Sequence, residues 1–386
     1  MTNNSHIEQL IQNLCPNGVK YMPLEEVLDY EQPTKYIVKS TEYNDAYKTP
    51  VLTAGQGFIL GYTNETDGIY KASKANPTII FDDFTTSYHW VDFNFKVKSS
   101  AMKMLRPRNN NLDVSFRYVY YAMLGIDYSP SEHSRQWISK YALFTIPLPP
   151  LPIQEEIVRT LDAFANLIEN IDTEIKERER QLELTREAIF SNVETSCSEW
   201  STLGQISKKV VSGGTPSRKV TQYFNGDIPW LRTQEIDWKD VYDTEIHITE
   251  EAVRNSAATI IPANCLIIAM YGATAGKACI NRIPLTTNQA CCNLVIDRNR
   301  VFYKYAYYWV CKEYLNIKGM GEGSQDNING QKVKSYPIPL PSLAEQRAIA
   351  EKLDTIEALI ANLKTERDLR QQQYEYYREH LINLLK

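Results

Sequence analysis

Features typical of membrane, secreted or metal-binding proteins are rare in this sequence of 386 residues. No run approaches the roughly 18 apolar residues that a bilayer-spanning helix needs. The longest, residues 260–271, is interrupted by Pro262 and Asn264. The first residues lack the basic and apolar regions of a signal peptide, so we expect a cytoplasmic protein without membrane contact. The seven cysteines form no C-x-x-C pair, which argues against a zinc ribbon or a disulfide framework.

Motifs for catalysis and cofactor binding are also scarce. Gly272–Lys277 resembles a phosphate loop, but only three residues separate its glycines, and alanine follows the lysine where Ser or Thr would bind magnesium. The five histidines are scattered, and no Asn/Asp-Pro-Pro-Tyr/Phe motif for methyl transfer to a base is present. Asp82 and Asp83 follow an apolar run and are interpreted as an acidic turn, with a metal site as the alternative. We therefore predict a non-catalytic chain that binds no metal and no cofactor.

Acidic charge is concentrated in two segments of the chain. The sequence has 42 basic and 47 acidic side chains, a net charge of −5. Residues 151–197 hold five basic and eleven acidic side chains, and residues 342–386 hold seven and eight. Residues 198–341 hold 16 basic and 13 acidic side chains, so this part can present local basic faces.

The sequence contains two copies of one plan, offset by 192 residues. Ile146-Pro-Leu-Pro-Pro-Leu-Pro-Ile-Gln154 returns as Ile338-Pro-Leu-Pro-Ser-Leu-Ala-Glu-Gln346, and the match continues without a gap for about 45 positions. Each proline cluster ends an extended segment and precedes about 40 residues that lack glycine and proline, which predicts a long helix. The repeat predicts four parts, which are residues 1–146, 147–197, 198–337 and 338–386.

A heptad pattern follows each proline cluster. Apolar residues recur at steps of four and three, which predicts a helix with one apolar seam. Two such helices in matching register most simply pack on each other. The seam residues are Ile157, Leu161, Phe164, Ile168, Ile171 and Ile175 in the first copy and Ile349, Leu353, Ile356, Ile360 and Leu363 in the second.

The two larger parts have the pattern of mixed α and β domains. Short β-rich runs such as residues 77–81 and 265–270 are separated by Gly, Asn and Asp. Each part then has one aromatic helix candidate, residues 116–124 and 303–311. The predicted fold is therefore α/β (α+β), in two tandem copies separated by two long helices.

Several loops have a composition suited to contact with DNA. Ser212–Lys219 is small, polar and basic, so its backbone N–H groups, hydroxyls and cations can meet phosphates. Gly321–Gly330 is rich in amides, which pair with base edges, and residues 134–136 stand at the corresponding place in the first copy. Residues 53–57 and 271–277 are interpreted as another pair of equivalent loops. The candidate DNA-binding residues are Gly214, Thr215, Ser217, Arg218, Lys219, Lys277, Ser324, Gln325, Asn327, Gln56, Ser134, Arg135 and Gln136.

With these motifs the chain resembles the specificity (S) subunit of type I restriction–modification systems over essentially its whole length. The first copy departs from the family pattern because it lacks Gly-Thr-Pro-Ser and Thr-Asn-Gln-Ala. The motifs that carry the resemblance are Pro147–Gln154, Pro339–Gln346, Gly214-Thr-Pro-Ser217, Ile228-Pro-Trp230, Thr274-Ala-Gly-Lys277, Thr287-Asn-Gln-Ala290 and Gly323-Ser-Gln325.

The resemblance implies that residues 1–146 and 198–337 are target recognition domains, each reading half of a split sequence in double-stranded DNA. The helices would pair as an antiparallel coiled coil and set the half-site spacing. They would also dock two methyltransferase subunits, which bind S-adenosylmethionine, and restriction (nuclease–translocase) subunits would join the complex. The chain itself would be no enzyme.

Other classes of function stay open at this point. Net acidity slightly favours a scaffold whose helices recruit partners and whose β-rich domains bind protein, whereas the polar glycine-rich loops oppose it. A fragment of a nuclease–methyltransferase fusion is disfavoured by the absence of cofactor motifs. The S subunit of a related restriction type that also uses separate S subunits is a further alternative. Binding that weakens steeply as salt rises would distinguish a DNA-binding protein from a scaffold.

Overall fold

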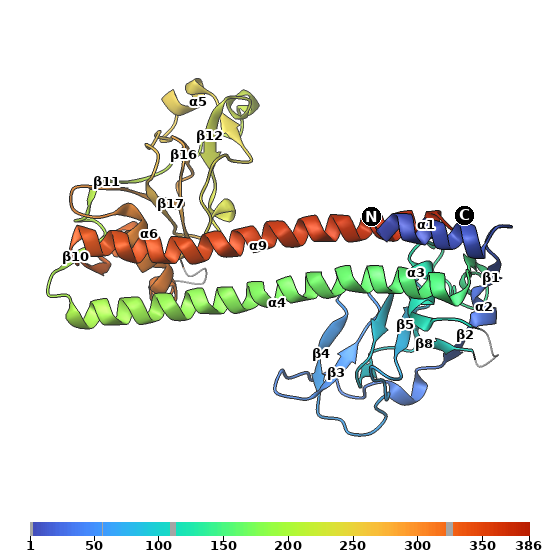
Figure 1. The fold of residues 1–386 in the computed structure, drawn as a ribbon. Coiled ribbons are helices and arrows are strands. Elements are labelled where there is room, and N and C mark those ends of the chain that lie inside the picture. The colour runs from blue at the N-terminus through green and yellow to red at the C-terminus, as the bar shows by residue number, and fades with distance from the viewer. Residues whose placement is uncertain (1–2, 56, 109–112, 322–326) are drawn as a thin grey trace. The chain divides into compact units, whose positions relative to one another are not determined.

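The computed structural model of the chain describes residues 3–55, 57–108, 113–321 and 327–386. The chain divides into two compact units: unit 1, residues 1–172 with 366–386, and unit 2, residues 173–365. Each unit combines a β-rich domain with parts of two long helices, α4 (Leu151–Ser196) and α9 (Leu343–Asn383) (Figure 1). No described helix is long and apolar enough to cross a membrane.

The first β domain, residues 21–147, contains two sheets and a short strand pair. The larger sheet is antiparallel in the order β2-β8-β5-β6, and the smaller has the order β4-β3-β7, in which β3 and β7 run parallel. The first and last strands of the domain, β1 and β9, pair with each other. The strands are β1 (Tyr21–Pro23), β2 (Leu28–Glu31), β3 (Thr49–Leu52), β4 (Ile59–Thr63), β5 (Thr78–Asp82), β6 (Tyr88–Val91), β7 (Lys96–Val97), β8 (Met102–Pro107) and β9 (Thr145–Pro147). The helices of this part are α1 (Asn3–Leu14), α2 (Leu24–Val27) and α3 (Phe116–Met123).

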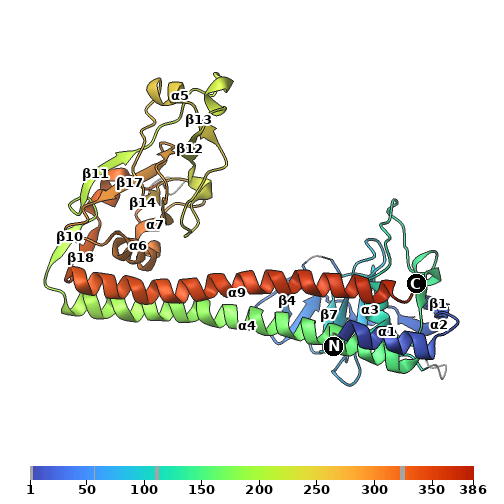
Figure 2. The same ribbon diagram turned by 45° about the horizontal axis from the view of Figure 1, so that its top comes forward.

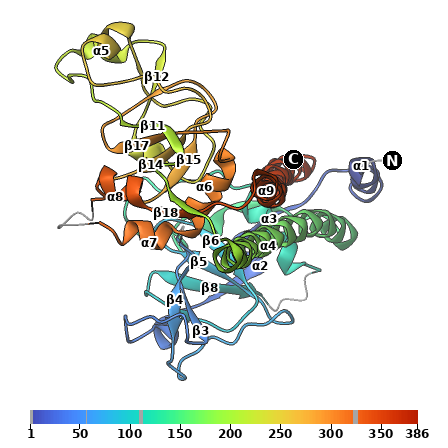
Figure 3. The same ribbon diagram turned by 90° about the vertical axis from the view of Figure 1, so that its left-hand side faces the viewer.

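The second β domain, residues 200–339, repeats this topology. Its sheets have the orders β11-β17-β14-β15 and β13-β12-β16, β12 runs parallel to β16, and β10 pairs with β18. The strands β11, β17, β14 and β15 of the larger sheet are labelled in Figure 3. The strands are β10 (Trp200–Thr202), β11 (Ser207–Ser212), β12 (Ile228–Leu231), β13 (His247–Ile248), β14 (Leu266–Ala269), β15 (Ala278–Ile280), β16 (Thr286–Thr287), β17 (Cys291–Ile296) and β18 (Pro337–Pro339). The helices are α5 (Glu250–Arg254), α6 (Tyr303–Lys312), α7 (Tyr314–Lys318) and α8 (Gly330–Ser335). The prediction of two tandem copies is confirmed.

Within each unit the parts of α4 and α9 run antiparallel (Figure 2). In unit 1, Leu161 near the start of α4 shares a core with Leu381 near the end of α9. In unit 2 the order is reversed, because Phe190 near the end of α4 shares a core with Leu353 near the start of α9. The aromatic helices α3 and α6 complete these cores, so each β domain packs on a helix pair.

The predicted seam residues are buried or half-buried. Fully buried are Ile157, Leu161 and Leu353, and nearly so are Ile171, Ile175, Ile349 and Ile360. Half-buried are Phe164, Ile168, Ile356 and Leu363. The Phe164 ring stacks on Tyr377, with ring centroids 5.1 Å apart. The seam therefore packs within this chain, which leaves other faces of α4 and α9 for partners.

A buried glutamine anchors each β domain at the start of its helix. The Gln154 side-chain oxygen accepts from the backbone N–H of Ser115 (2.9 Å), and its amide donates to the carbonyl of Pro149 (2.7 Å). Gln346 makes the corresponding bonds at 2.9 and 2.8 Å. Both side chains are buried, so the protein itself supplies the hydrogen-bond partners of their amide groups.

A tyrosine from each aromatic helix provides a second duplicated anchor. Tyr121 of α3 donates to Asp162 of α4 (2.5 Å), and Tyr308 of α6 donates to Asp354 of α9 (2.6 Å). A cation four residues before each tyrosine pairs with the same carboxylate. Burial raises the pKa of both phenols, so they remain hydrogen-bond donors at neutral pH.

Candidate nucleic-acid interface

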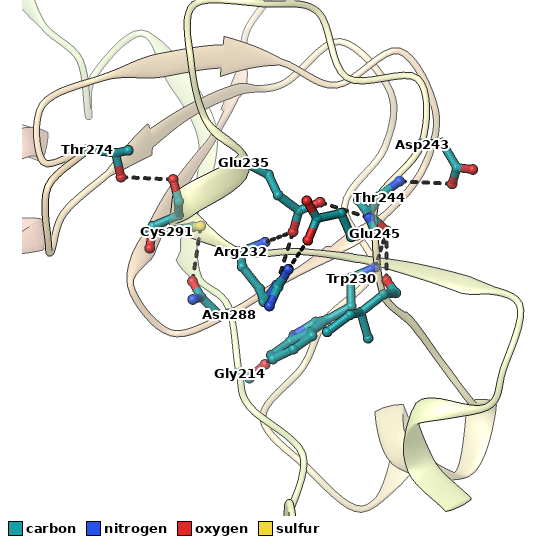
Figure 4. A network of polar contacts seen from close by, with 12 residues as sticks. Gly214, Trp230, Arg232, Glu235, Asp243, Thr244, Glu245, Thr274, Asn288 and Cys291 are labelled. Atoms are coloured by element: carbon teal, nitrogen blue, oxygen red, sulfur yellow. Dashed lines mark hydrogen bonds and ion pairs between the residues drawn. The ribbon is translucent and has the colours of Figure 1, made fainter. Parts of the chain in front are cut away.

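The motif residues of the second β domain converge on the loop that follows β11. The Trp230 indole donates to the carbonyl of Gly214 (2.9 Å) (Figure 4). The Gly214 N–H donates to the carbonyl of Thr287 (2.9 Å). A Cβ on Gly214 would lie 2.2 Å from the backbone carbonyl carbon of Ala257, so only glycine fits. Three motifs that are distant in sequence therefore fix one loop.

The end of that loop faces solvent. Ser217, Arg218 and Lys219 are exposed, whereas Pro216 is buried and holds the base of the loop. The exposed Thr215 hydroxyl donates to the side chain of Gln289. Hydroxyls and two cations at an exposed tip are suited to contact with phosphate oxygens.

The turn after β12 contains a compensated arginine and an exposed amide. Arg232 pairs with Glu235 (3.2 Å) and with Glu245, so its charge is balanced inside the domain (Figure 4). The neighbouring Gln234 is exposed, and with its amide turned so that the oxygen faces Arg232, that oxygen accepts from the guanidinium at 3.0 and 3.1 Å. Gln234 follows Trp230 of the Ile-Pro-Trp motif by four residues, and no sequence motif singled it out.

The predicted contact residue Lys277 is engaged by a carboxylate. Its ammonium group pairs with Asp237, and this hydrogen bond lowers the pKa of Asp237. In the same loop Thr274 donates to the carbonyl of Thr233 (2.8 Å), which joins residues 271–277 to the turn after β12. In this structure Lys277 therefore holds two loops together, and only about a quarter of its side chain is exposed.

The predicted equivalence of residues 53–57 with residues 271–277 is wrong. The first segment follows β3, whose counterpart in the second domain is β12. The second segment connects β14 to β15, and its counterpart in the first domain is the turn between β5 and β6. Both loops contain Gly and Ala between strands, and that shared composition gave a false match.

In the first β domain the three predicted residues of segment 134–136 differ in their exposure to solvent. Ser134 and Arg135 are exposed, whereas Gln136 is fully buried. The Gln136 amide donates to the Ser134 carbonyl (2.7 Å), and its oxygen accepts from the Tyr128 hydroxyl (2.7 Å). The polar atoms of the Gln136 side chain are therefore used inside the domain.

Three of the predicted residues, Gln56, Ser324 and Gln325, lie outside the described residues. Asn327 is half-buried. One backbone hydrogen bond agrees with the correspondence between segments 134–136 and 321–330. The Gln136 N–H donates to the carbonyl of Asp83, directly after β5, and the Ile328 N–H donates to the carbonyl of Met270, directly after the equivalent strand β14, both at 2.8 Å.

The outer faces of α4 and α9 carry matching exposed apolar residues. Leu167 and Leu359 are related by the 192-residue offset and are 37% and 39% exposed. Leu184 and Tyr376 have the same relation and are 60% and 61% exposed.

Comparison with known proteins assigns the family. The model of the type I restriction modification DNA specificity domain matches residues 16–179 and again residues 197–369. The chain belongs to this family. Its two matches confirm the prediction of a specificity subunit rather than an enzyme.

Individual relatives support the same family. The EcoR124I/EcoR124II specificity subunit of Escherichia coli is 41% identical over 406 residues, which covers 100% of this chain and 98% of the relative. The MjaIX specificity subunit of Methanocaldococcus jannaschii is 34% identical over 169 residues, covering 42% of this chain and 38% of the relative. The S subunit of M. genitalium has the same fold, with a TM-score of 0.61 at 16% identity and coverage of 95% and 96%.

Proposed function

We propose that this specificity subunit recognises a split sequence in double-stranded DNA, with one β domain on each half-site. In this proposal residues 1–146 and 198–337 are the target recognition domains, and residues 147–197 and 338–386 are the spacer helices. The duplicated anchors carry the proposal, since two domains of one topology are fixed in the same way to equivalent helices. Their loops differ, which is what reading two different half-sites requires.

The proposed DNA contacts fall into two kinds. Exposed cations and hydroxyls at residues 215–219 would bind phosphates and fix the register of the second domain, while exposed amides would read base edges. In the first domain the exposed Ser134 and Arg135 take this role, and Arg is well suited to guanine. Proposed on sequence alone are Gln56, Ser324, Gln325 and Asn327, while Gly214 and Gln136 would position their loops and Lys277 would do so through Asp237.

The helices would dock the other subunits through their outer faces. Because the seam is buried, we propose exposed residues at equivalent positions of the two helices as contact points. These are Leu167 and Leu359 at one position and Leu184 and Tyr376 at another. Two equivalent surfaces fit two copies of one methyltransferase subunit, which would supply S-adenosylmethionine and the methyl-transfer chemistry. Restriction subunits would join that assembly, and the complex would act on DNA in the cytoplasm.

A binding experiment tests this function against the scaffold alternative. The complex of this chain with its methyltransferase subunits is titrated with DNA that carries both half-sites, or with one half-site scrambled. We expect each scrambled half-site to weaken binding and the affinity to fall steeply as salt rises. Equal binding to all three DNA molecules, or no dependence on salt, would favour the scaffold.

A further inference from the structure

A buried ion pair lies beneath the candidate reading segment of the first β domain. Asp83 directly follows β5, and its Oδ2 lies 3.0 Å from the Nζ of Lys103 in β8, with each side chain 1% exposed. Its other oxygen, Oδ1, accepts from the backbone N–H groups of Gln136 (3.1 Å) and Trp137 (2.8 Å). The Asp83 carboxylate therefore joins the sheet to residues 136 and 137, which lie more than fifty residues later in the sequence.

The Gln136 side chain makes a second set of hydrogen bonds that hold the same part of the chain. Its side chain binds the Tyr128 hydroxyl on one side and the carbonyl and hydroxyl oxygens of Ser134 on the other. Residues 128–137 are thus fixed at both ends by buried polar groups. Arg135, between the bonded residues Ser134 and Gln136, remains 53% exposed, and its Nη1 lies 4.0 Å from the Asp83 carboxylate.

Among the described residues of the second β domain, no buried carboxylate takes the place of Asp83. The equivalent backbone bond runs from Ile328 to the carbonyl of Met270 at 2.8 Å, as Gln136 bonds to the Asp83 carbonyl at 2.8 Å. Both Ile328 and Met270 are buried apolar residues, so packing takes the place of the carboxylate. Because the ion pair and its partners all lie in the first β domain, the half-site of the second domain serves as the internal reference for a change to the pair.

We propose that Asp83, paired with the buried Lys103, is the positioning residue that aims Arg135 at the DNA and so sets base specificity in the half-site of the first domain. This inference rests on the proposed function. A carboxylate is suited to the task because one oxygen accepts from two backbone N–H groups while the other forms an ion pair with the ammonium group. A buried charge left unpaired would be costly, so Lys103 holds Asp83 in place.

Two charge-free double variants separate the acceptor from the ion pair. Asp83→Met with Lys103→Met removes the charges together with the acceptor for the segment. Asp83→Asn with Lys103→Gln also removes the charges but keeps an oxygen facing the N–H groups of residues 136 and 137. Neither variant leaves a lone buried charge. The matched control is Thr78→Val, which removes a buried hydrogen bond from Thr78 to the Leu105 carbonyl in the same sheet.

Base discrimination is read from a plasmid library with both half-sites randomised, methylated by the complex with its methyltransferase subunits and sequenced base by base. The Met/Met variant is expected to lose about tenfold in discrimination at positions of one half-site only. The Asn/Gln variant and Thr78→Val should discriminate as the unmodified chain does.

Three results would overturn the inference. The first is unchanged discrimination by the Met/Met variant, and the second is an equal loss in both half-sites, which would indicate general destabilisation. The third is an equal loss in the Met/Met and Asn/Gln variants, which would make the acceptor irrelevant. An unmodified complex that discriminates at neither half-site would instead refute the proposed function, and the inference would fall with it.

Discussion

Gln154 and Gln346 make the same hydrogen bonds at the starts of two helices, although 192 residues separate them. Each amide joins the loop before an aromatic helix to the proline segment that leads into the long helix. Each is buried, so its loss leaves backbone groups without a partner. These two residues fix where each β domain sits on the helix pair of its own unit.

Removing one of these amides should loosen one unit and spare the other. Gln154→Ala is expected to lower the free energy of unfolding of unit 1 by about 2–3 kcal/mol, because it leaves a buried N–H group and carbonyls unsatisfied. Gln346→Ala should do the same in unit 2. Hydrogen exchange resolved by segment measures the effect. The control is Gln181→Ala, an exposed residue of α4, and an equal effect of either buried variant on both units would contradict the assignment.

The outer faces of the helices give a prediction about assembly. Leu184→Glu with Tyr376→Glu should weaken binding of the methyltransferase subunits at least tenfold, since a buried charge replaces apolar contact. The melting temperature of the free chain should change little, because both side chains are exposed. Co-purification and titration measure the binding. Leu315→Glu, in an exposed position on α7, is the matched control and should assemble normally.

The basic loop tip gives a prediction about salt dependence. Arg218→Ala with Lys219→Ala should weaken binding to all DNA sequences alike and reduce the slope of log affinity against log salt by about two. Discrimination between correct and scrambled half-sites should remain, because phosphate contacts carry no sequence information. Arg254→Ala removes another exposed cation of the domain and serves as the control. An unchanged slope in the double variant would remove this loop from the interface.

Glu357 of α9 gives a prediction about pH. Burial raises its pKa above the ordinary carboxyl value, although the hydrogen bond from Tyr308 opposes this shift. The folded state therefore binds the Glu357 proton more tightly than the unfolded state does. The free energy of unfolding falls as pH rises from the ordinary carboxyl pKa through the raised pKa of the folded state. Glu357→Gln should be more stable than the unmodified chain near neutral pH.

Below the ordinary carboxyl pKa both states of the unmodified chain are protonated, so the advantage of Glu357→Gln should shrink there. Thermal unfolding of the two proteins across this pH range measures the difference. Glu351→Gln, at an exposed position of the same helix, is the control. An advantage that is independent of pH would contradict the assignment to Glu357.

The helices and their seam were predictable from sequence because the 192-residue offset holds there without a gap. The sheets were harder, because loops of different length shift the correspondence. The offset between equivalent strand positions is 179 residues for Tyr21 and Trp200, but 190 residues for Lys96 and Thr286. Matching of loops by composition failed for this reason at residues 53–57 and 271–277.

The burial of loop residues could not be predicted either. Gln136 lies in a polar segment without periodicity, and its burial depends on Asp83, which is distant in sequence. Lys277 looked available for phosphate, but the carboxylate that engages it, Asp237, comes from another loop. Composition identified the loops, whereas the direction of each side chain depended on contacts that only the folded chain brings together.

Adenine methylation mapped base by base tests the central claim most directly. Cells that carry the methyltransferase gene with this chain are compared with cells that carry the methyltransferase alone. The account predicts methylation at a new split sequence only when this chain is present, with both half-sites visible in the aligned sites. A soluble complex that adds no new methylation pattern would contradict it.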